Sequence, residues 1–145
     1  YVRVRTPALP LTLADGTVKT LRELTQSRPV LLLEVSETCR ACQPIITEVE
    51  AWRELLPEVE IRLLLGREAG DTELTSLAEP QSLHDPEHYV SLSLGYWGTP
   101  SAVLLGADGL LAGGPVSGEL DIRTFVDDIQ GQFRGADDPP PETEA

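Results

Sequence analysis

The chain has 145 residues, with 24 acidic and 11 basic side chains, a formal net charge of −13 and no methionine. This length favours one domain that can fold without a disulfide, and the negative charge disfavours binding to nucleic acid or anionic lipid. No apolar run approaches the roughly 20 residues of a membrane-spanning helix. Because Tyr1 is not a translation start, we expect a processed or truncated piece, from which any signal peptide or anchor is gone.

The first part of the chain predicts a β-hairpin, a helical turn and a buried strand. Residues 9–21, LPLTLADGTVKTL, alternate apolar and polar side chains around Asp15-Gly16, a dipeptide that favours a tight hairpin turn. Thr20 can cap a helical turn over residues 21–24. Residues 30–35, VLLLEV, are typical of a strand that is buried on both faces.

A helix and a second strand then complete a βαβ unit. Residues 43–56 place Val49, Trp52 and Leu56 on one face and stop at Pro57, which predicts a helix with Trp52 packed in the core. Residues 59–65, VEIRLLL, form a second buried strand, and the unit should be right-handed and parallel.

The rest of the chain predicts two short helices, a second hairpin and a final helix. Asp71 can cap a helix through residue 78, and Asp85-Pro86-Glu87 can begin another that runs to residue 94. Residues 101–114, SAVLLGADGLLAGG, predict a hairpin that turns at Asp108-Gly109, followed by a helix over about 119–133. We expect one domain over residues 1–134, with residues 135–145, GADDPPPETEA, as an acidic, proline-rich disordered tail.

The two cysteines, Cys39 and Cys42, lie between the strand at 30–35 and the helix that follows. Unpaired amides and the positive end of a helix dipole there would lower the pKa of the Cys39 thiol. Arg40 adds a positive charge, whereas Glu37 opposes it. Cys42 is close enough in sequence to form a small disulfide ring with Cys39. A CxxC pair is a weak signal alone, but within a βαβ unit it indicates a redox pair.

A second motif, Gly98-Thr99-Pro100, immediately precedes the strand at residue 101. A proline is permitted at the start of a strand, and a cis bond there would be a specific feature. With LADGTVKTLREL, PVLLLEVSETCRAC and GTPSAVLLGADG, the chain resembles the thioredoxin superfamily over roughly residues 8–130, and within it the TlpA-like and MauD-like extracytoplasmic branch. The resemblance implies a thioredoxin-like α/β fold, a central mixed sheet flanked by helices, with an N-terminal β-hairpin extension.

The resemblance also implies a function. Cys39 would be the nucleophile and Cys42 the resolving cysteine of a thiol-disulfide oxidoreductase, with Thr99-Pro100 as a cis-proline clamp for the substrate. Trp97 would contact a partner protein at the lip of the site. No cofactor or metal is expected. The implied partners are protein thiols and disulfides and a membrane redox protein, and the implied location is extracytoplasmic, with a membrane tether on the full-length protein.

Some positions depart from the family pattern. Arg40 and Ala41 replace the usual proline-containing pair between the cysteines, so the sequence does not indicate the direction of electron flow. Leu33 occupies the place of the buried acid of thioredoxins, six residues before the first cysteine. Glu34, its neighbour, should be buried, with either a role in proton transfer or an ion-pair partner.

Two alternative functions remain open at the level of sequence. Cys39 and Cys42, together with His84 and His88, supply four ligands suited to zinc or copper, although 41 residues separate the two pairs. Surface histidines flanking a helix start are the favoured interpretation of His84 and His88. The second alternative is an idle thioredoxin-like interaction domain with two structural thiols.

Overall fold

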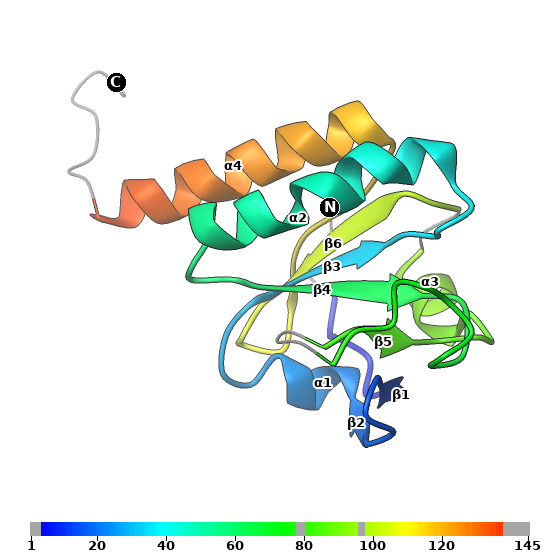
Figure 1. Ribbon diagram of the computed structural model, residues 1–145. Helices are drawn as coiled ribbons and strands as arrows, with labels where there is room; N and C mark the ends of the chain where they lie inside the picture. The colour runs from blue at the N-terminus through cyan, green and yellow to red at the C-terminus, as the bar shows by residue number, and fades with distance from the viewer. Residues whose placement is uncertain (1–3, 78–80, 96–97, 138–145) are drawn as a thin grey trace.

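The computed structural model describes residues 4–77, 81–95 and 98–137. These residues form a seven-stranded mixed sheet in the order β2-β1-β5-β4-β3-β6-β7, with helices on both faces (Figure 1). The strands are β1 (Pro10–Leu13), β2 (Val18–Thr20), β3 (Val30–Glu34), β4 (Glu60–Leu65), β5 (Leu83–His84), β6 (Ser101–Leu105) and β7 (Leu111–Ser117). The helices are α1 (Leu21–Leu24), the 3-10 turn η1 (Arg40–Cys42), α2 (Gln43–Leu55), α3 (Tyr89–Leu94) and α4 (Glu119–Asp137).

The N-terminal hairpin is confirmed, with β1 and β2 antiparallel. Gly16 has a φ of 87° in the turn, a conformation that glycine adopts without steric cost. Thr20 and Glu23 form the predicted cap as a reciprocal pair: the Glu23 amide donates to Thr20 Oγ1 at 3.1 Å, and the Thr20 amide donates to Glu23 Oε1 at 2.9 Å. This capping box fixes the start of α1 beside the hairpin.

The predicted βαβ unit is also present, since β3 and β4 pair in parallel. All five residues of β3 are buried, because β3 lies between β4 and β6 and helices cover both of its faces (Figure 1). Helices α2 and α4 pack on one face. Buried residues there include Leu31, Leu33, Cys42, Ile45, Val49, Trp52, Ile122, Val126 and Ile129.

The opposite face of the sheet is covered by α1 and α3. Its core includes Leu21, Leu24, Leu32, Leu83, Val90, Leu94 and Val103. Successive residues of a strand point to opposite faces. Leu33 therefore points toward α2, whereas Glu34, which alternates with it, lies on the α3 side of the sheet.

The prediction of a helix that begins at Asp71 is wrong, because residues 71–77 form turns and irregular loop. The segment has little apolar surface to bury, and Leu77 is 67% exposed. Strand β5 was not predicted. Helix α3 begins at Tyr89, later than expected, although Asp85 still caps it by accepting the amides of Tyr89 at 3.1 Å and Val90 at 2.9 Å.

The C-terminal half agrees more closely with the sequence analysis. Strands β6 and β7 form the predicted hairpin, with Gly109 at a φ of 81°. Helix α4 continues past Phe133 to Asp137, so it includes the first three residues of the segment expected to be a tail. Residues 138–145 lie outside the described residues, and the division of the chain at residue 134 stays a prediction. None of the helices in the described part of the chain has the length and apolarity needed to cross a membrane.

Candidate active site

Cys39 and Cys42 lie on a short helical turn between β3 and α2. Cys39 is the N-cap of η1, and Cys42 is the N-cap of α2. The predicted start of the helix at residue 43 is confirmed, so Cys39 lies one turn before α2 and Cys42 directly before it. Pro44 suits this start, because it has no amide to donate to the Arg40 carbonyl and is tolerated in the first turn of an α-helix.

The two cysteines form a disulfide, with their Cα atoms 5.2 Å apart. They differ in exposure: Cys42 is fully buried among the side chains under α2, whereas Cys39 is partly exposed. An external sulfur can therefore reach Cys39 and not Cys42.

The loop before Cys39 is held by hydrogen bonds on both sides. Ser36 accepts the Thr38 amide through Oγ at 3.2 Å and the Cys39 amide through its carbonyl at 3.2 Å. From α2, Gln43 Nε2 donates to the Glu37 carbonyl at 3.1 Å. These contacts fix Cys39 above the end of β3. Arg40 is exposed beside it.

The Thr99-Pro100 segment lies directly against the disulfide. The Thr99 carbonyl oxygen is 3.6 Å from Cys39 Sγ, a distance at which a reduced Cys39 thiol can donate to it. The Thr99–Pro100 peptide bond is cis, the isomer that the sequence predicts. Thr99 is exposed and Pro100 is buried. Trp97, the third predicted substrate contact, lies outside the described residues.

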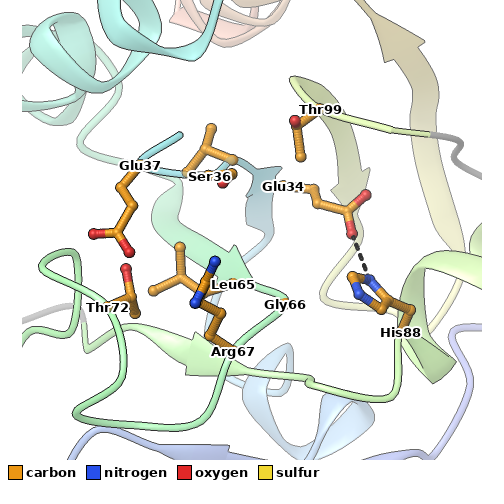
Figure 2. A pocket seen from close by; sticks show the side chains of 10 residues that line it. Glu34, Ser36, Glu37, Leu65, Gly66, Arg67, Thr72, His88 and Thr99 are labelled. Atoms are coloured by element: carbon orange, nitrogen blue, oxygen red, sulfur yellow. Dashed lines mark ion pairs between the residues drawn. The ribbon is translucent and has the colours of Figure 1, made fainter. Parts of the chain in front are cut away.

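Glu34 is buried, as expected, with only 6% of its side chain exposed. Burial raises the pKa of the Glu34 carboxyl, and a hydrogen bond from Ser91 and the nearby imidazole of His88 offset this only in part. His88 Nδ1 lies 3.9 Å from Glu34 Oε2, and the two side chains point toward one another (Figure 2).

A pocket of about 110 Å³ opens between Glu34 and the loops beside the disulfide. Glu34 and His88 lie on one side of it and Glu37 and Thr72 on the other in the view of Figure 2. The residues that line it are Glu34, Val35, Ser36, Glu37, Leu65, Gly66, Arg67, Thr72, His88 and Thr99. Thr99 therefore borders both the disulfide and this pocket.

The ligands required by the metal alternative are not gathered in one place. His84 is buried, contrary to the expectation of a surface residue, and its ring nitrogens lie 3.0 Å from the Arg67 carbonyl and 3.0 Å from Ser82 Oγ. His88 faces Glu34 instead. Over residues 4–77, 81–95 and 98–137, no three His, Cys, Asp or Glu side chains form a group that could hold a metal.

Sequence reasoning missed the part of the site that His88 forms. His88 has a φ of 59°, a left-handed conformation that is uncommon outside glycine, and its ring lies over Gly66. A Cβ atom added to Gly66 would lie 2.4 Å from Cε1 of that ring, so the ring would have to shift. No local pattern signals this contact, because it joins the end of β4 to the segment before α3.

No protein-family model matches the chain, and no curated protein matches it. Solved structures do. A candidate thiol:disulfide interchange protein DsbE from Chlorobium tepidum is 16% identical, with a TM-score of 0.72 over 90% of this chain and 95% of that chain.

Two further structures come from proteins whose names place them outside the cell or on its surface. A secreted Mycobacterium tuberculosis disulfide oxidoreductase, homologous to E. coli DsbE, is 15% identical, with a TM-score of 0.60 over 88% of this chain and 95% of that chain. An exposed lipoprotein thioredoxin from Streptococcus pneumoniae is 15% identical, with a TM-score of 0.57 over 82% of this chain and 97% of that chain. The chain has the thioredoxin-like fold.

Proposed function

We infer that the protein is a thiol-disulfide oxidoreductase, which exchanges disulfides with partner proteins through Cys39 and Cys42. The observation that carries this inference is the disulfide itself: a partly exposed Cys39 is bonded to a fully buried Cys42 and lies 3.6 Å from the Thr99 carbonyl. A disulfide that only stabilised the fold would need neither a reachable sulfur nor a neighbouring backbone acceptor. The solved structures with this fold include proteins described as disulfide oxidoreductases.

The difference in exposure between Cys39 and Cys42 supports the roles that we propose for the two sulfurs. In the reducing direction, the Cys39 thiolate attacks a substrate disulfide, a Cys39–substrate disulfide forms, and the other substrate sulfur leaves as a thiolate. The Cys42 thiolate then attacks Cys39 Sγ, which restores the Cys39–Cys42 disulfide and releases the second substrate thiolate. Two electrons pass from the pair to the substrate, and the reverse sequence oxidises a substrate dithiol.

Thr99 and Pro100 would hold the substrate during this exchange. An extended segment of the partner can pair with the exposed backbone of Thr99 and so bring its sulfur to Cys39. Trp97 is proposed from the sequence as an apolar contact for the same segment. Arg40, next to Cys39, would help to stabilise the thiolate by its charge.

We propose that Glu34 influences the pKa values of the site. It is a buried carboxyl that can hold a proton below Thr99. It pairs in register with Ser101, next to the cis-proline. This role is distinct from that of the buried acid of thioredoxins, whose position Leu33 occupies on the opposite face of the sheet.

We propose an extracytoplasmic location, a membrane tether on the full-length protein, and a membrane redox protein among its partners. The description of two similar structures as a secreted protein and an exposed lipoprotein supports the location. Structural disulfides persist in oxidising compartments, so substrates that contain them would be available there.

Catalysed reduction of insulin disulfides by dithiothreitol tests the proposed function. The wild type should accelerate the reaction, and Cys39→Ser should abolish the acceleration. Cys42→Ser should instead accumulate a mixed disulfide with the substrate, because the resolving step is lost. A wild-type protein that leaves the reaction rate unchanged would support an idle interaction domain.

A further inference from the structure

The pocket beside Thr99 is built around a buried carboxylate. Glu34 ends β3, where pairing with Leu64 of β4 and Ser101 of β6 fixes its backbone. Its side chain is 94% removed from solvent yet forms part of the wall of an open pocket. A carboxylate in such a place has a desolvation cost, which a positively charged ligand would offset.

His88, which lies on the same side of the pocket as Glu34, has a strained backbone conformation (Figure 2). The left-handed backbone of His88, with a φ of 59°, is unfavourable for a non-glycine residue. The conformation is enforced by its surroundings: the His88 amide donates to the Asp85 carbonyl at 3.0 Å, and the ring packs on Gly66. The result is a ring held toward Glu34 with 56% of its side chain still exposed.

The charges around Glu34 favour a cation. Glu34 on β3, Glu37 in the loop after it and Asp85 before α3 are acidic, while Arg67 after β4 is basic and the imidazole of His88 faces Glu34. Asp85 and Glu37 already accept backbone amides, from Tyr89 and Val90 and from Glu73 respectively. Glu34, whose neighbours are the Ser91 hydroxyl and the His88 imidazole, is the carboxylate that we assign to a ligand. The net charge of −13 attracts basic partners.

We propose that this pocket is a specificity subsite that receives a lysine or arginine side chain next to the reacting cysteine of a protein substrate. The inference rests on the proposed function. A substrate segment on Thr99 passes the mouth of the pocket, because Thr99 lines it. The pocket volume suits the end of one long side chain, and an ammonium or guanidinium group within it would form a charge-assisted hydrogen bond with Glu34.

Single-cysteine peptides joined by a disulfide to a chromophoric thiol test the proposal. Three peptides differ only in the residues flanking the cysteine, which are lysine, norleucine or glutamate, and the reduced protein releases the chromophore as it attacks. The readout is the ratio of second-order rate constants for the lysine and norleucine peptides, in which any change in Cys39 reactivity cancels. We expect a ratio of roughly ten, the value of one charge-assisted hydrogen bond.

Three variants separate the contributions of the charges. Glu34→Gln should reduce the ratio to about one, whereas Arg67→Gln should increase it by removing a competing cation. Glu58→Gln is the matched control: Glu58 is exposed and precedes β4, at the opposite end of the strand from Gly66, and its substitution should leave the ratio unchanged. If Glu34→Gln does not fold, the wild-type ratio measured against pH serves instead and should rise as Glu34 ionises.

The outcomes distinguish this inference from the proposed function. No reaction with any of the peptides would contradict the proposed function itself. Reaction at equal rates with the lysine and norleucine peptides would overturn the specificity subsite alone. A preference for the glutamate peptide that Arg67→Gln abolishes would also overturn it, because the pocket would then bind an anion.

Discussion

The sulfur of Cys39 lies 3.6 Å from the carbonyl oxygen of Thr99, and this contact joins two loops whose contacting residues are 60 positions apart in the sequence. This contact places the reachable sulfur of the pair and an exposed backbone segment on one surface. A partner that pairs with Thr99 would present its own sulfur to Cys39, and its neighbouring side chain would pass the pocket that contains Glu34.

The two thiols should differ in their reactivity toward alkylating agents. In the reduced protein, the Cys39 thiol of Cys42→Ser should react with iodoacetamide at least about tenfold faster than the Cys42 thiol of Cys39→Ser, because Cys42 is fully buried. The measurement is the rate of carbamidomethylation by mass spectrometry near neutral pH. Faster reaction of Cys42 would reverse the roles assigned to the two sulfurs.

Glu34 should make stability depend on pH. The pKa of the Glu34 carboxyl is raised in the folded state, so protonation of this carboxyl favours folding. The stabilising contribution is complete below a pH of about 4.3, the pKa of a glutamate in the unfolded chain. This contribution is lost as the pH rises through the higher pKa of the folded state. Relative to Glu34→Gln, the free energy of unfolding of the oxidised wild type should therefore fall with rising pH.

Urea unfolding of both oxidised proteins from acid to neutral pH measures this difference. Glu58→Gln, at an exposed site, should follow the wild type across the whole range. A difference between wild type and Glu34→Gln that stays constant, or that grows in favour of the wild type as the pH rises, would contradict the burial argument.

The backbone of His88 should make glycine a better replacement than alanine. His88 has a φ of 59°, which glycine adopts freely and alanine adopts at a cost. His88→Gly should therefore be more stable to urea than His88→Ala by about 1 kcal/mol, despite the greater entropy of glycine in the unfolded state. Equal stabilities, or a more stable alanine variant, would show that the left-handed conformation is not imposed by the fold.

The capping box of α1 should contribute measurably to stability. Thr20→Ala removes a hydrogen bond to the Glu23 amide and should reduce the free energy of unfolding by about 1 kcal/mol. Thr47→Ala is a suitable comparison, since Thr47 is exposed within α2 and alanine favours helix. A Thr20→Ala variant as stable as Thr47→Ala would mean that tertiary contacts alone hold α1.

Elements with strong local patterns could be predicted from the sequence, and tertiary details could not. The apolar runs of β3 and β4 and the turns at Gly16 and Gly109 identify their elements directly. Asp71 has the chemistry of a helix cap, but of the two leucines that follow it in the described segment Leu77 is exposed, so the segment does not bury an apolar face. Strand β5 has two residues, too few for a period-two pattern to appear.

The same division applies to the site. The CxxC pair and the proline before β6 are adjacent to their elements in sequence, so their position at one end of the sheet could be predicted. The pairing of Glu34 with His88 could not, because it depends on the register of β3 and on a left-handed residue 54 positions away. The pocket that both residues line is a property of the folded chain.

The reduction potential of the Cys39–Cys42 pair tests the central claim most directly. The protein is equilibrated in glutathione buffers of graded potential and alkylated, and its oxidised fraction is counted by mass spectrometry. An exchanging pair should equilibrate reversibly, with a potential between about −270 mV, typical of a reductant, and about −120 mV, typical of an oxidant. A pair that fails to equilibrate, or a potential below about −300 mV as in structural disulfides, would contradict the account.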